Sequence, residues 1–492
     1  MAMEDAGVRL AYQRFGFGAK PGARAATLAE LKIRLLKEIS PDAARLAASD
    51  LPSTARAIQL VAEVEERQRE RRLAARQLAA NPAPMMEGAQ PGKSMEPNKS
   101  MEPGKSMEAG KPPTPPPPDP DALRFRDFVN VEARARIDAG VAADIGFAER
   151  WVEFWSNHFC VATRRGRIIS GIVGAYEREA IRAHAFGMFA DMLRAVETHP
   201  AMLHYLDQRQ SIGPTSPAGQ RQKKGLNENL AREILELHTL GVGGGYAQAD
   251  VTNFAKVLTG WSVSNFEENI DGFGGFFFAP NRHEPGAQLV LGKNYTEEGK
   301  EQGLAVLRDL ARHPSTAKFI TRKLARHFVA DAPPPALVAR LEQDFRRTGG
   351  DLASLARVLI QSGEAWTVPQ VKLRKPYEFL IASLRATGEK SDRVPAMLNA
   401  LNMMGQPLWN PPGPTGHPDD EASLMAPKAI KTRLEFAVQV ARQVGNRIDP
   451  RELADHLYGA ALSQDTKQAI ARAETKPQGL ALLLMSTEFQ RR

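Results

Sequence analysis

The sequence contains very little cysteine and no long apolar run. Cys160 is the single cysteine among 492 residues, which excludes an intramolecular disulfide framework and a zinc site built from several thiolates. No run of about 18 or more apolar residues occurs, so the sequence predicts no transmembrane helix. The first residues include Glu4 and Asp5 and lack the apolar segment of a secretory signal, which makes a cytoplasmic location the default expectation.

Charge of one sign is not concentrated anywhere in the chain. The 65 Lys and Arg residues and the 57 Asp and Glu residues give a net charge of +8, and the two signs are well mixed. Proteins that bind nucleic acids usually gather basic side chains beside aromatic rings that stack on bases. The short basic groups at 164–167 and 223–224 have no such rings beside them, so we expect no nucleic-acid partner.

Familiar catalytic motifs are also missing. The sequence contains neither an HExxH metal motif nor a GxSxG nucleophile elbow. The glycine-rich stretch GVGGGYAQAD (241–250) lacks the Lys-Ser/Thr ending of a phosphate-binding P-loop, and the end of one helix followed by the start of another explains it without a ligand. No single motif therefore defines a reaction.

A low-complexity segment divides the chain. Residues 81–121 contain the repeats KSMEPN, KSMEPG and KSMEAG, followed by PPTPPPPDP. Proline and glycine recur too often there for a helix, and large apolar side chains that need burial are scarce. We therefore predict a disordered tether, rich in Pro and Met and stiffer at its polyproline end.

Elsewhere the apolar residues mostly recur at helical spacing. This pattern predicts a long surface helix over 54–80 and a succession of helices from 122 to 490. The stretch 272–295 differs, because an aromatic run, a Pro/Gly turn and QLVLG predict a β-hairpin inserted between helices. The expected fold is mainly α, a multi-helix globular architecture with one small β-hairpin. Its expected segments are an N-terminal helical segment of the main fold (1–80), the tether (81–121), a central helical region (122–366) and a C-terminal helical region packed on the same fold (367–492).

The stretch NENLAREILELHTLGVGGGYAQAD carries the densest group of polar side chains. In a helix over 227–240, Asn227 and His238 lie on the inner, apolar arc. Glu228 and Arg232 lie on the outer arc, at the i,i+4 spacing of an ordinary surface ion pair. The histidine is therefore expected to face the interior, with the charged side chains outside.

A second inward histidine is predicted in WVEFWSNHF, where His158 lies in an apolar stripe beside two tryptophans. A single histidine in such a place is usually a core residue with one hydrogen-bond partner. The alternative is that His158 and His238 converge across a helix–helix interface and are joined by His283. With a carboxylate from Glu284 or Asp250, three imidazoles would bind a divalent metal ion. Without a metal, a buried histidine beside a carboxylate would serve as a general base.

Several motifs together resemble one protein family. RFGFGAKPG, WVEFWSNHF, HPAMLHYLD, LNENLAREILELHTLGVGGGYAQADV and LLLMSTEFQRR are similar to the bacterial domain-of-unknown-function-1800 family, over nearly the whole chain. The family signature falls on Asn157, His158, Asn227, Asn229, Arg232, Glu233, His238 and Asp250. The resemblance implies no particular reaction. It does imply that members are often exported and accompany sulfatase-like proteins, so an exported or periplasmic location and a sulfatase-like partner are further expectations. The chain departs from the family pattern at His417, where an aromatic residue is expected.

Two hypotheses for the function follow. In the first, the protein is a hydrolase, with or without a divalent metal, whose pocket is lined by His, Arg and Glu between the helices over 144–162 and 227–240. Its expected catalytic residues are His238, His158 and Glu233, and its expected ligand-binding residues are Asn157, Asn227, Asn229, Arg232, Asp250 and His283. In the second, the protein is a non-catalytic scaffold that acts with a sulfatase-like protein.

Overall fold

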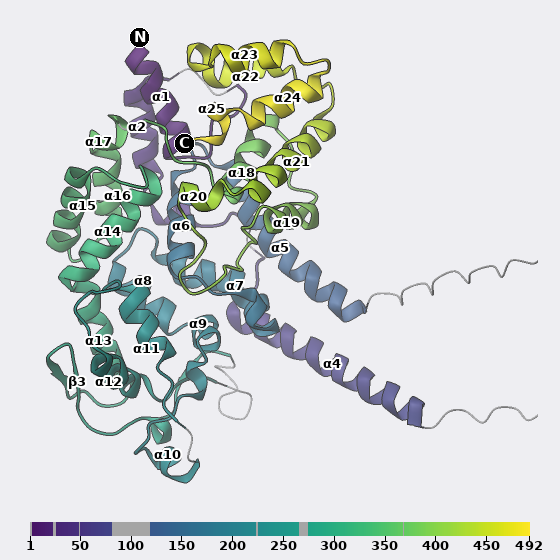
Figure 1. Cartoon of the computed structure of the whole chain (residues 1–492). Helices are drawn as coiled ribbons and strands as arrows, with labels where there is room; N and C mark the ends of the chain where they lie inside the picture. The colour runs from purple at the N-terminus through teal and green to yellow at the C-terminus, as the bar shows by residue number, and fades with distance from the viewer. Residues whose placement is uncertain are drawn as a thin grey trace, which may run out of the picture.

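The fold is mainly helical, as predicted (Figure 1). The computed structural model describes residues 2–22, 26–48, 50–80, 119–222, 225–264, 274–367 and 369–492. Most of the predicted tether, residues 81–118, lies outside the described residues. Its last three residues belong to the fold instead, because Asp119 caps the helix that begins at Pro120 and accepts a hydrogen bond from the backbone N–H of Asp121 at 3.0 Å.

The described residues form the following helices. The helices of the first half are α1 (Ala2–Arg14), α2 (Leu28–Lys37), α3 (Pro41–Ala44), α4 (Thr54–Ala80), α5 (Pro120–Ala142), α6 (Phe147–His158), α7 (Arg167–Tyr176), α8 (Phe189–Glu197), α9 (Pro200–Tyr205), α10 (Pro217–Gln222), α11 (Asn229–Glu233) and α12 (Gln248–Leu258). Those of the second half are α13 (Lys300–Arg312), α14 (Pro314–Phe328), α15 (Pro335–Thr348), α16 (Leu352–Gln361), α17 (Glu364–Thr367), α18 (Pro376–Thr387), α19 (Val394–Met403), α20 (Glu421–Leu424), α21 (Pro427–Val444), α22 (Pro450–Tyr458), α23 (Gln464–Ala471), α24 (Lys476–Met485) and α25 (Thr487–Gln490). Short π or 3-10 segments are η1 (Thr163–Arg165), η2 (Glu177–Ile181), η3 (Arg182–His184), η4 (Gln208–Gln210), η5 (Ile234–His238), η6 (Pro280–Arg282) and η7 (Gly459–Ala461). Among the described helices, none is both long and apolar enough to cross a lipid bilayer.

Two small antiparallel sheets lie among the helices. β1 (Trp261–Val263) pairs with β2 (Phe276–Phe278), and β3 (Gln288–Val290) pairs with β4 (Lys293–Tyr295). The two strands predicted to form one hairpin therefore do not pair with each other, because each has another partner. Trp261 is fully buried and meets Phe276 edge to face, with ring centroids 5.4 Å apart, which favours the pairing of the aromatic run with β1.

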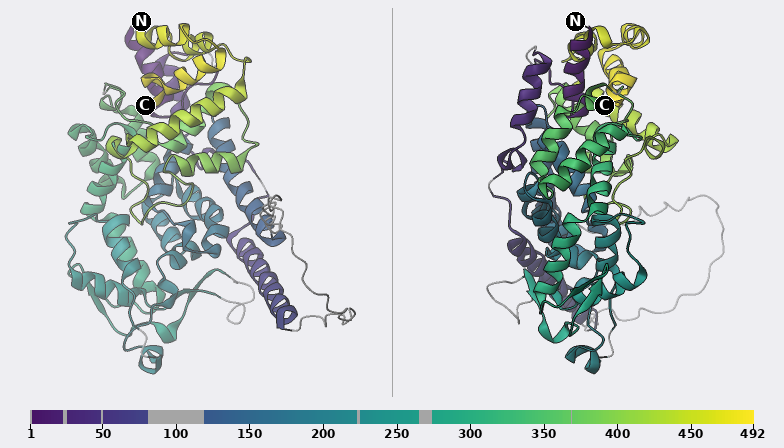
Figure 2. Two further views of the ribbon diagram at one scale, coloured as in Figure 1. Left: turned by 45° about the vertical axis from the view of Figure 1, so that its right-hand side comes forward. Right: turned by 90° about the vertical axis from the view of Figure 1, so that its left-hand side faces the viewer.

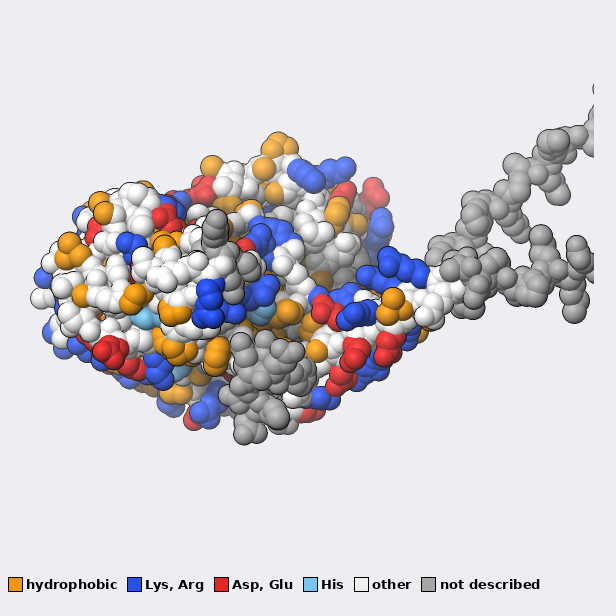
Figure 3. Space-filling model, turned by 90° about the horizontal axis from the view of Figure 1, so that it is seen from below, with side chains coloured by type: hydrophobic (Ala, Val, Ile, Leu, Met, Phe, Trp, Pro, Cys, Tyr) orange, Lys and Arg blue, Asp and Glu red, His pale blue; other side chains and the backbone are white. Residues whose placement is uncertain are grey.

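Helices α4 and α5 lie side by side and project from the body as an arm (Figures 1 and 2). Arg71 of α4 forms ion pairs with Asp119 and Asp121 at the start of α5, at 2.6 and 3.0 Å. Beyond these pairs, Arg72 and Leu73 of α4 are exposed. The long surface helix predicted over 54–80 is thus confirmed. On the face of the molecule that Figure 3 shows, positive and negative side chains are mixed, as the sequence predicts.

The buried apolar side chains form two cores. The larger core surrounds α6, whose Trp151 and Trp155 are fully buried, and includes side chains of α1, α7, α8, α14 and α16. The smaller core lies among α18, α21 and α24. Charged side chains connect the helices of the two cores, since Arg150 of α6 lies 3.3 Å from Glu378 of α18. Helix α6 therefore has an apolar surrounding on one side and a polar one on the other.

Two of the predicted helices contain a π-helical turn that the periodicity did not indicate. Among the helices predicted between 122 and 490, the one that begins as α7 continues as the π-helical turn η2, and the one predicted over 227–240 consists of α11 followed by η5. Asn227 precedes α11, so its predicted place on one helical arc with His238 is wrong. His238 itself lies at the end of η5 and is buried, as predicted.

Candidate functional site

Helix α6 is buried on nearly all sides. Its aromatic stripe faces the larger core, as the sequence predicts. The opposite arc is buried as well, because Glu153 is only 3% exposed and forms an ion pair with Lys375 at 2.8 Å. The last residues of the helix, Asn157 and His158, contact segments that come much later in the chain.

His158 uses both ring nitrogens in hydrogen bonds. Its Nε2 donates to the backbone oxygen of His238 at 3.1 Å, and its Nδ1 accepts from the Nζ of Lys323 at 2.9 Å. Because a carbonyl only accepts and an amine donates here, His158 is held as the tautomer with its proton on Nε2. Burial, and then the charge of Lys323, keep the pKa of His158 well below its usual value, so the ring is neutral.

His238 is bound to a carboxylate. Its Nδ1 donates to Oε1 of Glu197 at 2.8 Å, and both side chains are almost completely buried. The predicted convergence of the two inward histidines is found, since the rings of His158 and His238 lie 6.3 Å apart between centroids. Glu197, His238, His158 and Lys323 form one connected series, which we call the histidine chain.

Lys323 is the least buried member of the histidine chain. It extends from α14, is half-buried, and lies over the ring of Phe319 at 5.2 Å. Burial lowers the pKa of Lys323 to about 8, although Cys160 and Asp419 partly oppose the shift. Among the described residues, no carboxylate oxygen lies within ion-pair distance of this amine. Its hydrogen-bonded partner is the neutral imidazole of His158.

Lys323 and Glu197 are not among the site residues that the sequence predicts. Lys323 lies in RKLARHF, between apolar residues of α14. His327, four positions later in the same helix, is buried, and residues at this spacing share a helix face. That spacing was an available signal. Glu197 ends α8 without any motif, and its pairing with His238 depends on tertiary structure alone.

Glu233 and Arg232 have different surroundings although they are adjacent. Glu233 is half-buried, and burial raises its pKa, an effect that His238 partly opposes. Arg232 forms the predicted surface ion pair with Glu228 at 2.9 Å, with a further hydrogen bond to Gln248. The charge of Glu233 is thus influenced by His238, whereas Arg232 has other partners.

Two of the three asparagines singled out by the sequence, Asn157 and Asn227, bond to backbone, and the third, Asn229, is exposed. Asn157 donates to the backbone oxygen of His417 at 3.0 Å and accepts from its N–H at 2.8 Å. The side-chain oxygen of Asn227 accepts from the N–H of Asn229, the first residue of α11. The Asn227 amide also donates to the backbone oxygens of Leu206 and Asp207 at 3.2 Å. Asn227 thus fixes a turn before α11.

The predicted three-histidine metal site is not formed. The Nδ1 of His283 donates to the backbone oxygen of Thr259 at 3.0 Å. Glu284 accepts two hydrogen bonds from Thr215 instead of lying beside a histidine. Asp250 is in the first turn of α12 rather than its N-cap, and it accepts from the N–H groups of Ala247 and Leu291.

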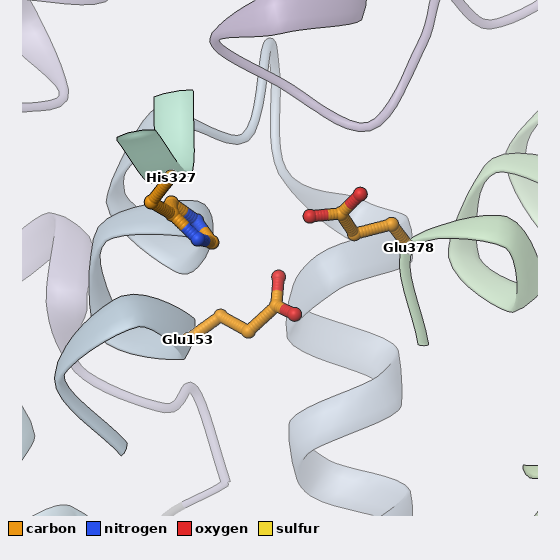
Figure 4. A group of neighbouring side chains, drawn as sticks. All are labelled: Glu153, His327 and Glu378. Carbon is orange, nitrogen blue, oxygen red and sulfur yellow. The ribbon is translucent and has the colours of Figure 1, made fainter. Parts of the chain in front are cut away.

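A different group of side chains lies close enough together to hold a metal ion. Among the described residues, Glu153, His327 and Glu378 are the one such group found, and their polar ends point toward one another (Figure 4). Arg150 lies among them, with one nitrogen 3.4 Å from Nε2 of His327 and 3.3 Å from Glu378. Arg492 binds the other oxygen of Glu378 at 2.6 Å.

These cations already neutralise the carboxylates of this group. Burial alone would raise the pKa of Glu378, but Arg150, Arg492 and Lys375 lower it well below the usual range. The Nδ1 of His327 donates to Asp419 at 3.0 Å, and its Nε2 faces Arg150, so neither nitrogen is open to an ion. A divalent ion would have to displace an arginine, so these residues fit an ion-pair network better than a metal centre.

Comparison with known proteins gives a family and no individual relative. The sequence profile described as "Protein of unknown function (DUF1800)" matches residues 10–491. No curated protein and no solved structure matches the chain. The match covers both cores and the histidine chain.

Proposed function

Because the chain belongs to the DUF1800 family, whose description names no reaction, we propose its function from the geometry of the histidine chain. We propose that the protein is a hydrolase in which Lys323 is the general base and Glu233 the general acid. The observation that carries this proposal is the 2.9 Å contact between the Lys323 amine and a neutral, buried His158. His158 and His238 are then positioning residues.

Lys323 meets the chemical requirement for a base. An ordinary lysine is protonated at neutral pH and cannot accept a proton. With a pKa of about 8, about one-tenth of the Lys323 amines are neutral at pH 7 and about half are neutral at pH 8. A neutral Nζ takes a proton from an attacking water molecule and becomes an ammonium group, while one of its N–H bonds remains directed at His158 Nδ1.

The rest of the histidine chain holds the amine in place. The backbone oxygen of His238 fixes the tautomer of His158, which leaves Nδ1 free to accept from Lys323. Glu197 in turn orients the ring of His238. Because His158 is neutral, it positions Lys323 without adding a positive charge beside it.

Glu233 supplies the complementary group. Burial raises its pKa, so a larger fraction of it is protonated near neutral pH than for an exposed glutamate. A base whose pKa is lowered and an acid whose pKa is raised are the combination that hydrolysis needs, since one proton is removed from water and another is given to the leaving group. This pairing supports hydrolysis over a reaction that needs only a base.

The experiment compares two lysines of α14 in the full chain. Wild type, Lys323→Met and Lys318→Met are assayed against p-nitrophenyl esters, phosphates, sulfates and glycosides. Lys318 is exposed on the same helix and serves as the control. We expect wild type and Lys318→Met to hydrolyse one of these classes, and Lys323→Met to lose about 100-fold or more in rate. Absence of hydrolysis in every class, or equal rates in both variants, would contradict the proposal.

The second candidate is a scaffold that acts with a sulfatase-like protein. The projecting arm formed by α4 and α5 favours it, because such an arm offers a large accessible surface to a partner. Under this alternative, a purified sulfatase-like protein binds wild type and Lys323→Met equally. Binding then weakens when the exposed Arg72 and Leu73 are both replaced by Ser.

A further inference from the structure

A cavity lies under the proline-rich loop that contains residues 405–418. Its walls come from α5, α6, α7, η2, α18 and the loop, and it encloses about 540 Å³ including its open mouth. The side chains that matter for its chemistry are Glu153, Asn157, Cys160, Glu177, Trp409 and His417. Lys323 and the two histidines of the histidine chain do not line this space.

The loop is fixed over the cavity by close contacts with α6. Asn157 bonds to both the N–H and the C=O of His417. Gly416 has φ +85, and a side chain there would meet the backbone oxygen of Asn157 at 2.5 Å, so only glycine permits this approach. Cys160 donates its thiol proton to the backbone oxygen of Pro414 at 3.3 Å. The loop therefore forms a defined roof.

One buried hydrogen-bond acceptor at the cavity lacks a donor. It does not belong to Glu153, which is 3% exposed and has Lys375 in an ion pair with Oε1 and Arg150 3.8 Å from Oε2. His417 donates from Nε2 to the backbone oxygen of Pro407 at 3.1 Å. Its Nδ1 is therefore a lone-pair acceptor, and this buried atom has no partner among the described residues.

The charges around the cavity are already balanced, which selects against an ionic ligand. Glu177 lies 2.7 Å from Arg136 and 3.0 Å from Arg182, and Glu153 faces Lys375. Burial, and then Lys375, lower the pKa of His417 to about 4, so this ring is neutral at physiological pH. A cationic ligand would meet arginine and lysine, and an anion would meet two carboxylates. What the cavity lacks is neutral donors, which hydroxyl groups provide.

An aromatic side chain completes the site. Trp409 has φ +53, a backbone conformation that a bulky residue rarely adopts. Its Nε1 donates to Glu177 at 2.9 Å, and its backbone oxygen accepts from Thr163 at 3.0 Å. These bonds hold the indole at the cavity in a strained conformation, and aromatic rings beside polar acceptors suit the apolar face and hydroxyl edge of a sugar ring.

We propose that this cavity binds a neutral polyhydroxylated ligand, a sugar residue or polyol, whose hydroxyl groups donate to Nδ1 of His417 beside the Trp409 ring. The proposal goes beyond the hydrolase proposal and does not depend on it, because binding requires no turnover. If Lys323 has no catalytic role, the cavity remains a binding site.

Binding is tested by calorimetry on the full chain, with glucose, N-acetylglucosamine, cellobiose, sorbitol and glycerol as probes. We expect at least one probe to bind wild type and Lys323→Met equally, and to bind at least tenfold more weakly to His417→Phe, which removes the acceptor and keeps a ring. The exposed His456→Phe is the control and should bind as wild type. Binding of the sugars alone indicates a cyclic ligand, and equal binding of sorbitol indicates an acyclic polyol; both support the site.

A second measurement needs no variant, because the single cysteine lines the cavity. Cys160 is 5% exposed, and burial raises the pKa of its thiol to about 12, so it reacts slowly with a disulfide reagent at neutral pH. A bound probe is expected to slow that reaction at least fivefold further. Failure of all five probes to bind at tens of millimolar, or binding that neither protects Cys160 nor weakens in His417→Phe, would overturn the proposal.

Discussion

Two groups of buried polar side chains lie against α6, and they differ in how their charges are matched. In the cluster around Glu378, the carboxylate is bound by Arg150 and Arg492. In the histidine chain, the hydrogen-bonded partner of the Lys323 amine is the neutral His158. Matched charges keep their usual protonation and connect helices of the two cores. The unmatched amine has its pKa lowered into the range where it exchanges protons.

The largest expected effect is on the matched cluster. Glu378→Gln leaves Arg150 and Arg492 buried without their carboxylate, so we expect the free energy of unfolding to fall by about 3–5 kcal/mol. Urea unfolding followed by circular dichroism measures it, with Glu66→Gln on the exposed surface of α4 as the control. A loss below about 1 kcal/mol would show that the arginines are neutralised by other groups.

A Glu→Gln substitution in the histidine chain should lower the free energy of unfolding by less than Glu378→Gln does. In Glu197→Gln the amide oxygen still accepts from Nδ1 of His238, and no cation is left unpaired. We expect a loss of about 1–2 kcal/mol in the same unfolding experiment. If Glu197→Gln destabilises the protein as strongly as Glu378→Gln, the two groups do not differ in charge matching and the comparison fails.

Removing the Lys323 amine should not lower the free energy of unfolding at neutral pH. Lys323 has a folded-state pKa of about 8, below its ordinary value of 10.5, so between these values the unfolded chain binds more protons and stability rises with pH. Below about pH 8 Lys323 is charged in the wild type, and the burial of its ammonium group lowers the free energy of unfolding. We expect Lys323→Met to equal or exceed wild type by about 1 kcal/mol at pH 7. This advantage should shrink between pH 8 and pH 10.5, and a difference independent of pH in that interval would contradict the lowered pKa.

The smallest effect is expected at the surface pair of α11. Arg232 and Glu228 have side-chain exposures of 39% and 30%, and exposed pairs contribute little. Arg232→Ala should therefore change the unfolding midpoint only marginally and leave hydrolysis intact. Loss of hydrolysis in this variant with the fold retained would show that Arg232 binds the ligand, as the sequence predicts.

The helical pattern and the two inward histidines were predictable because each depends on local periodicity. Amphipathic spacing located α4 over 54–80, and the helices of the second half lie within the stretch predicted as helical. It also placed His158 and His238 in the interior. The periodicity failed over 227–240 for two reasons. The helix begins only at Asn229, so Asn227 lies outside the arc it was expected to share, and η5 is a π-helical turn, which changes the angle between residues.

The polar partners were not predictable from local patterns. Glu153 lies on the arc opposite the tryptophans and would ordinarily face solvent, yet Lys375, far along the chain, buries it. Lys323 acquires its lowered pKa only where α14 meets the end of α6. Such sites need side chains from distant segments, and sequence spacing carries no information about which distant segments meet.

The buried position of Arg492 has a consequence for the order of events during synthesis. Its guanidinium donates to the backbone oxygen of His327, 165 residues earlier, and its own N–H bonds to the backbone of Lys372. Until residue 492 has left the ribosome, Arg150 is the one arginine among the described residues that forms an ion pair with Glu378. The junction between the two cores is therefore expected to close only once this residue has emerged, and a nascent chain halted before it should remain sensitive to protease at α18.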